Sequence, residues 1–155
     1  MDPKILYSSK TIDLFAITPE MEHEIPFTGS ISAGFASPAG DYTEDGIDFN
    51  KFLIRHPAAT FCGRTKGLSM LKFGIDDQDW LIFDRSLNPV DGKIAVCFVD
   101  NEYTLKQLKI EKDCCWLMPG NDDYKPIRVD ANNQFVVTAM LTFVIKPFWF
   151  YDSAY

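Results

Sequence analysis

Residues 93–110, KIAVCFVDNEYTLKQLKI, contain two runs rich in β-branched and aromatic side chains on either side of Asp100–Asn101. Aspartate and asparagine tolerate the backbone that a tight hairpin turn requires, so this segment predicts a β-hairpin. Strand alternation places Lys106 and Leu108 of the second run on the same face of a sheet. A face shared with Leu108 can be buried, which makes Lys106 a candidate for unusual chemistry.

Similar runs, bounded by Gly, Pro, Asn or Asp, recur on both sides of this hairpin and are typical of strands. They are ATFCGRT (59–65), DWLIFD (79–84), CCWLMP (114–119), IRVD (127–130) and QFVVTAMLTFVIKPF (134–148). The segment GIDFNKFLIRHP predicts a short helix with Asp48 as its N-cap and Pro57 as its stop. We therefore expect a mostly β, single compact domain over residues 34–147.

Residues 1–33 show no sustained helical or strand period, and predict an extended N-terminal arm. The arm holds five acidic and two basic side chains, and is too short and too acidic for a helix-turn-helix domain. Residues 148–155, FWFYDSAY, form an aromatic C-terminal tail that predicts extra packing or a partner surface.

Composition narrows the class of protein. The chain has 155 residues, of which 46% are apolar, enough for one folded domain. It has no apolar run near the roughly 20 residues of a membrane span and no secretory pattern at its N-terminus, so we expect a cytoplasmic protein. A net charge of −7 argues against direct sequence-specific DNA binding, and favours contact with DNA metabolism through protein partners.

Four cysteines lie at positions 62, 97, 114 and 115, without the C-x-x-C spacing of a zinc site. We expect reduced, mostly buried thiols, no metal and no cofactor.

The segment TKGLSMLKFG (65–74) presents Ser69 in a glycine-flanked turn. A serine is a poor nucleophile unless a base takes its proton, and nothing in the positions of His23 or His56 favours either as that base. A lysine with a pKa of about 10.4 is neutral in about one molecule in 2,500 at pH 7, and lowering that pKa to about 7 destabilises the cation by roughly 4–5 kcal/mol. Burial of Lys106 on a rigid sheet would do this. The residues alone also allow an ordinary turn serine and a solvated lysine.

Ser69 in KGLSM, followed 37 residues later by Lys106 in EYTLKQL, resembles the dyad of the LexA/UmuD family of Ser–Lys self-cleaving proteases. SAGFASPAGDY (32–42) resembles the family's self-cleavage segment. LMPGNDDYKPI (117–127) resembles its Leu-x-Pro-x-Asn-x-x-Tyr/Phe-x-Pro-Ile signature. The resemblance covers about residues 32–147. It departs from the family pattern at Leu68, where UmuD-like sequences often have aspartate, and at Gln78, where the family usually has glycine in a turn.

The resemblance implies a serine endopeptidase in which Ser69 is the nucleophile and Lys106 the general base. The backbone N–H groups of Leu68 and Ser69 would form the oxyanion hole, and the cleaved bond would be Ala33–Gly34. Cleavage would divide the chain into an arm (1–33) and a protease-like β domain (34–147) with its tail (148–155).

UmuD-like members of the family resemble this chain most. They are homodimers of the SOS response to DNA damage, stimulated by the RecA filament on single-stranded DNA. The shortened dimer serves as an accessory subunit of an error-prone translesion polymerase with UmuC, and the same partners are expected here. The alternative is a non-proteolytic dimeric binding subunit that regulates a translesion polymerase. A signal-peptidase-like enzyme is disfavoured by the lack of a membrane segment, and a repressor by the short arm.

Overall fold

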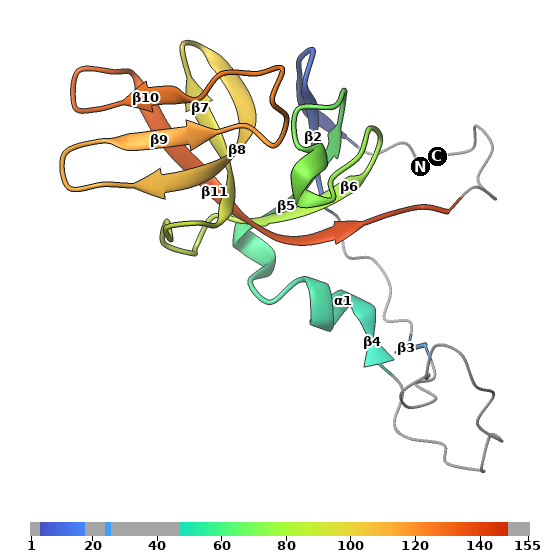
Figure 1. Ribbon diagram of the computed structural model, residues 1–155. Helices are drawn as coiled ribbons and strands as arrows, with labels where there is room; N and C mark the ends of the chain where they lie inside the picture. Colours follow the sequence, from blue (N-terminus) through green and yellow to red (C-terminus); the bar gives the residue numbers. More distant parts are fainter. Residues whose placement is uncertain (1–3, 18–23, 26–46, 149–155) are drawn as a thin grey trace, which may run out of the picture. The chain divides into compact units, whose positions relative to one another are not determined.

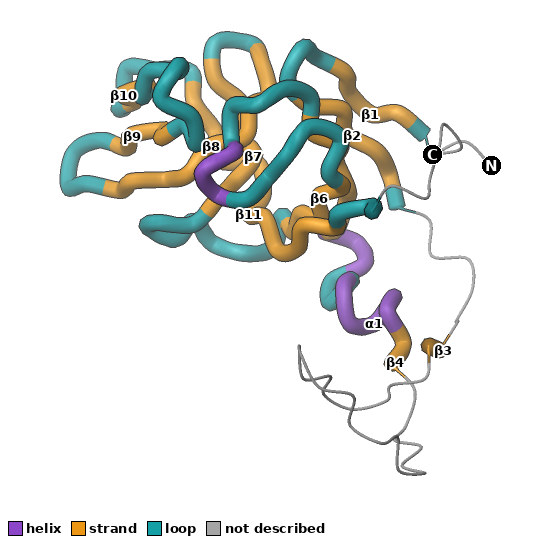
Figure 2. Tube along the Cα trace, turned by 45° about the vertical axis from the view of Figure 1, so that its right-hand side comes forward, coloured by secondary structure: helices purple, strands orange, loops and turns teal. Residues whose placement is uncertain are grey.

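The computed structural model describes residues 4–17, 24–25 and 47–148. Strands dominate these residues (Figure 2). The strands of the main sheet are β1 (Ile5–Ser8), β2 (Ile12–Ala16), β5 (Thr60–Thr65), β6 (Trp80–Asp84), β7 (Ile94–Val99), β8 (Glu102–Ile110), β9 (Cys115–Met118), β10 (Ile127–Val129) and β11 (Phe135–Ile145). Within the described ranges they form one nine-stranded sheet, in the order β1-β2-β5-β6-β11-β7-β8-β9-β10 (Figure 1). All neighbouring strands are antiparallel.

Contacts divide the chain into two units, Met1–Ile17 with His56–Tyr155, and Thr18–Arg55. The described part of the second unit contains β3 (Glu24–Ile25) paired with β4 (Ile47–Asp48), followed by helix α1 (Phe49–Leu53). Asp48 caps α1 by accepting a hydrogen bond from the Lys51 N–H at 3.2 Å, as predicted. The boundary predicted at 33–34 marks a cleavage site, and the one predicted at 147–148 marks the start of the tail. Both stay predictions, because the two contact units do not bear on them.

The predicted strands from residue 59 onward are confirmed as β5 to β11, and so is the mostly β fold class. The hairpin between β7 and β8 turns at Asp100 and Asn101, whose φ angles are 50° and 64°. Val99 pairs with Glu102 across this two-residue turn. A left-handed pair of this kind matches the right-handed twist of the two strands, so the turn sets their register.

The structure corrects the prediction for the N-terminal segment. Residues 1–33 show no sustained strand period, yet β1 and β2 form a hairpin that joins the main sheet. β2 pairs with β5 along its whole length, from Ile12 opposite Thr65 to Ala16 opposite Phe61. Residues 4–17 are therefore part of the folded unit that contains Ser69 and Lys106.

The core lies on both faces of the sheet. One cluster contains Ile12, Leu14, Val96 and Leu105, and the other contains Ala95, Cys97, Leu108 and Leu117. Adjacent residues of one strand belong to different clusters because consecutive side chains point to opposite faces. The sheet curves far enough for β2 to contact β8.

The described part of the main unit also contains two short 3₁₀ turns, η1 (Pro57–Ala59) and η2 (Leu71–Phe73). None of the helices in the described segments is long and apolar enough to cross a membrane. Ser69 lies in the turn between β5 and η2.

Candidate active site

The Ser69 turn is held by a distant segment of the chain. The Ser69 carbonyl accepts a hydrogen bond from the Gly120 N–H at 2.7 Å, and the Lys72 N–H donates to the Gly120 carbonyl at 2.7 Å. The Asn121 side-chain amide donates to the Leu68 carbonyl at 2.9 Å. Residues of the LMPGNDDYKPI segment therefore clamp the turn on both sides of the serine.

Gly120 allows this clamp to approach the turn closely. A Cβ atom added at Gly120 would lie 2.7 Å from the Met70 Cα atom and 2.7 Å from the Phe73 ring. Ordinary side chains essentially never approach backbone at that distance. The structure thus assigns positioning contacts to Gly120 and Asn121 that the sequence motif alone did not reveal.

The backbone N–H groups of Leu68 and Ser69 are available to bind a substrate oxygen. Among the contacts of the described residues, neither the Leu68 N–H nor the Ser69 N–H donates to a protein acceptor. Ser69 is half-buried and Leu68 is exposed. An oxyanion hole requires pre-positioned donors of this kind beside the nucleophile.

Lys106 lies in the middle of β8, opposite Ala95 of β7, and is only 7% exposed. The predicted alternation is confirmed, because Leu108 on the same face is fully buried. Burial lowers the pKa of Lys106 below its ordinary value, against a smaller opposing effect from Cys97. No hydrogen bond or ion pair to the Lys106 side chain occurs among the residues that the structure describes. A lysine in this setting is a candidate general base.

Ser69 lines a small pocket of about 10 Å³, room for about one water molecule. Leu105, the neighbour of Lys106 on β8, also lines this pocket, together with Thr11 from the turn of the N-terminal hairpin. The structure thus brings the Ser69 turn to the strand that carries Lys106. Within the described part of the chain, no hydrogen bond joins Ser69 Oγ to Lys106 Nζ. The predicted cleavage residues Ala33 and Gly34 lie outside the described residues, as does the tail after residue 148.

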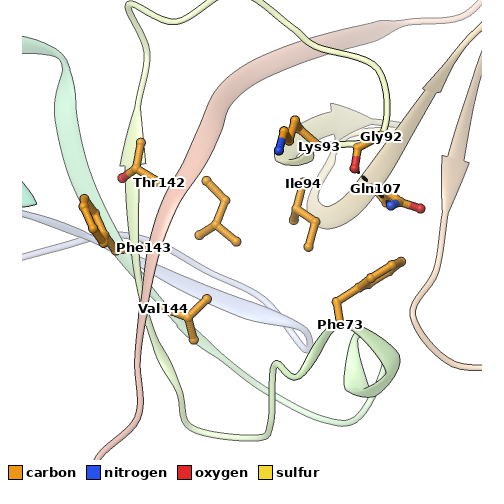
Figure 3. Close-up of a pocket in the computed structure, with 9 residues that line it drawn as sticks. Phe73, Gly92, Lys93, Ile94, Gln107, Thr142, Phe143 and Val144 are labelled. Atoms are coloured by element: carbon orange, nitrogen blue, oxygen red, sulfur yellow. Dashed lines mark hydrogen bonds between the residues drawn. The ribbon is translucent and has the colours of Figure 1, made fainter. Parts of the chain in front are cut away.

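A wider pocket of about 310 Å³ lies nearby, between η2, the segment before β7, β8 and β11 (Figure 3). Phe73, Ile94 and Val144 are among its lining residues (Figure 3). Its Phe73 lies in η2, which follows the Ser69 turn, and its Gln107 directly follows Lys106. Lys93 is the only titratable residue among those that line this pocket, and the other lining residues offer no acid or base. The pocket could therefore accommodate apolar side chains but contains no candidate acid–base pair.

His56 contacts Asp84 and Ser86 rather than Ser69. Its Nδ1 atom lies 2.6 Å from the Asp84 carboxylate and 3.1 Å from Ser86 Oγ. In a catalytic triad, one ring nitrogen of the histidine contacts the carboxylate and the other contacts the serine. Asp84 and Ser86 both contact Nδ1 of His56, so this arrangement is structural. Burial opposes ionisation of Asp84, but hydrogen bonds from His56 and Ser86 outweigh it and lower the pKa of Asp84. His23, the other histidine, lies outside the described residues.

All four cysteines are free, and Cys97 is fully buried whereas the others are partly exposed. Burial raises the pKa of Cys97 to about 12 and that of Cys62 to about 11. A thiol must ionise to act as a nucleophile, so these two are inert at neutral pH. The prediction of unpaired thiols is confirmed, and that of mostly buried ones holds for Cys97 alone.

Comparisons with known proteins agree with this geometry. The family model described as Peptidase S24-like matches residues 26–141. Protein MucA of Salmonella typhimurium is 41% identical over 115 residues, which are 74% of this chain and 78% of MucA. Protein SamA of the same species is 38% identical over 133 residues, 83% of this chain and 94% of SamA. The LexA repressor of Stenotrophomonas maltophilia is 31% identical over 129 residues, 83% of this chain and 61% of the repressor.

Proposed function

This chain belongs to the peptidase S24-like family of self-cleaving proteases that includes LexA and UmuD, and we propose that it cuts its own Ala33–Gly34 bond with Ser69 as nucleophile and Lys106 as general base. The observation that carries the proposal is the burial of Lys106 on β8, which lowers its pKa. A buried lysine gives up its proton at a lower pH than a solvated one and so can act as a base.

The proposed reaction proceeds in two stages. Neutral Lys106 takes the proton of Ser69, and Ser69 Oγ attacks the Ala33 carbonyl carbon. The N–H groups of Leu68 and Ser69 stabilise the resulting oxyanion. The Lys106 ammonium then protonates the Gly34 nitrogen as the peptide bond breaks, and water hydrolyses the Ala33 ester with Lys106 again as base.

We also propose the biological setting that the resemblance to UmuD-like proteins implies. The chain would act as a homodimer whose cleavage is stimulated by the RecA filament on single-stranded DNA. The shortened dimer would then join a UmuC-type polymerase in error-prone translesion synthesis. The net charge of −7 supports a role that reaches DNA through protein partners.

Intact-mass measurements on the purified chain test the proposal. The wild type should yield one fragment that ends at Ala33 and one that begins at Gly34, whereas Ser69→Ala and Lys106→Ala should stay whole. If the wild type stays whole alone, RecA, single-stranded DNA and a nucleoside triphosphate are added. A chain that is never cut but copurifies with a translesion polymerase would instead support the non-proteolytic dimeric binding subunit.

A further inference from the structure

The N-terminal hairpin is built into the sheet on both of its faces. Ile12 and Leu14 of β2 are 0% and 5% exposed and belong to the core cluster that also contains Leu105. Phe15 is 7% exposed and its ring lies 5.4 Å from that of Trp80. A strand buried on both faces is a structural part of a sheet, because removing it uncovers apolar surface on two sides.

Gly63 of β5 lies where the hairpin packs against that strand, and its lack of a side chain makes the close packing possible. A Cβ atom added there would lie 2.9 Å from the Phe83 ring and 3.2 Å from both the Asp13 carbonyl and the Leu14 side chain. The absence of a side chain at Gly63 therefore lets β2 lie against β5 while Phe83 packs beneath both. The edge of β5 is therefore complementary in shape to β2, the strand that pairs with it.

Lys66, which precedes the Ser69 turn, holds the other end of the hairpin. Its side-chain ammonium lies 2.6 Å from the Asp13 carboxylate and donates to the Ser9 carbonyl at 3.0 Å. Its backbone N–H donates to the Thr11 carbonyl at 2.9 Å. Burial opposes ionisation of Asp13, but the hydrogen bond from Lys66 helps to lower the pKa of Asp13.

The hairpin also reaches the strand that carries Lys106. The Tyr7 and Tyr103 rings meet edge to face at 4.8 Å, and the Tyr103 N–H donates to the Tyr7 hydroxyl at 3.4 Å. Residues 4–17 thus bridge β5 and β8, the two strands on either side of the Ser69 pocket.

We propose that the edge of β5 is a binding site for a β-hairpin, and that its occupant, residues 4–17, stays bound there after the Ala33–Gly34 bond is cut. The cut itself rests on the proposed function, whereas the retention rests on the contacts above. Scission and release of the N-terminal fragment are then separate steps. The hydrogen-bonding edge of β5, which would otherwise attract a strand from another chain, becomes exposed only in the second step.

The experiment uses a full-length Ser69→Ala chain with the recognition sequence of a site-specific protease inserted between Ala33 and Gly34. After complete cutting, verified under denaturing conditions, the mixture is analysed by native mass spectrometry and gel filtration. The expected result is one species that contains both fragments. Separate elution of the short fragment would overturn the proposal. Because the cut is external, a wild type that fails to cleave itself would refute the proposed function and leave this result unaffected.

Substitution of a buried and an exposed isoleucine tests whether the observed contacts of residues 4–17 with β5 and β8 retain the fragment. Ile12 is 0% exposed and Ile5 is 60% exposed on the same hairpin. Ile12→Ala should release the cut fragment at least about tenfold faster, and Ile5→Ala within about twofold of the parent rate. Equal release rates would overturn the proposal. If uncut Ile12→Ala lacks native circular dichroism, Lys66→Gln against the exposed Lys10→Gln provides the same comparison, with several-fold faster release expected for Lys66→Gln alone.

Discussion

At the scale of the residue, Lys106 carries a stability cost together with its proposed chemistry. Because burial lowers its pKa, the folded chain holds this proton less tightly than the unfolded chain does. The unfolded state therefore binds more protons between the folded pKa and the ordinary value of 10.5, and folding stability rises with pH through that interval. A lysine retained at such a position is typical of sites where function and stability conflict.

We predict that Lys106→Met, in a Ser69→Ala background, raises the free energy of unfolding at pH 7 by about 1–2 kcal/mol. The gain should shrink as the pH rises toward 10.5, because the unfolded-state lysine then also loses its proton and less charge has to be buried on folding. Lys109→Met on the same strand is the control, because the Lys109 side chain is 59% exposed and should leave stability nearly unchanged. Urea unfolding at pH 7 and pH 10 provides the measurement. A Lys106→Met chain less stable than its parent at pH 7 would contradict this account of burial.

Gln78 is a second residue under strain. Its φ angle is 68°, in the left-handed region that glycine adopts most easily. The family resemblance predicts glycine at this position. Gln78→Gly should therefore stabilise the fold by about 0.5–1 kcal/mol in urea unfolding. The Gln78 side-chain amide donates to the Thr65 carbonyl at 3.4 Å and to the Asp77 carboxylate at 3.2 Å. Gln78→Ala removes these hydrogen bonds, as Gln78→Gly does, but does not relieve the strain, so it should give no gain. Equal effects of the two substitutions would show that the backbone at this turn is not strained.

At the scale of the element, the clamp between the Ser69 turn and residues 120–121 positions Ser69, the proposed nucleophile. Asn121 donates to the Leu68 carbonyl from a segment more than 50 residues away, and Gly120 brings the two backbones together. The sequence signature marked this asparagine but did not indicate its partner. Which groups meet across such a distance is decided by how the loop after β9 folds back onto the Ser69 turn, and the local sequence pattern carries no information about it.

We predict that Asn121→Ala slows self-cleavage about tenfold, because losing one positioning hydrogen bond costs about 1–1.5 kcal/mol. Asp123→Ala is the control, since Asp123 is exposed and, among the described residues, its side chain makes no hydrogen bond to the turn. The fragment that begins at Gly34 is followed by intact mass at alkaline pH, with circular dichroism to confirm that both variants fold. An unchanged rate for Asn121→Ala would remove this residue from the positioning set.

At the scale of the whole molecule, the sequence predicted the sheet from β5 onward but missed its first two strands. In β5 to β8, turn residues and β-branched runs mark each strand locally, and the Asp100–Asn101 turn fixes the register between β7 and β8. β1 is mostly exposed and β2 is buried on both faces, so neither shows the alternation that identifies a strand. β5, the partner of β2 in the sheet, begins more than 40 residues later, and only the folded structure reveals the pairing.

The same contrast holds for the candidate site. Alternation on β8 correctly predicted that Lys106 shares a buried face with Leu108, whereas the roles of Ser69 and Lys106 came from a family resemblance. The contacts of Lys66 and Thr11 beside Ser69 could not be predicted, because they depend on the N-terminal hairpin that the sequence pattern did not show.

The pH dependence of self-cleavage tests the central claim most directly. The wild-type chain is incubated without activator from pH 7 to pH 10, and the fragment that begins at Gly34 is quantified by intact mass at each pH. If buried Lys106 is the base, the rate should rise with pH as the ammonium loses its proton and should level off below the ordinary lysine pKa of 10.5. Ser69→Ala should stay whole throughout. A wild-type rate that is flat from pH 7 to pH 10, or cleavage that persists in Ser69→Ala, would contradict the Ser69–Lys106 mechanism.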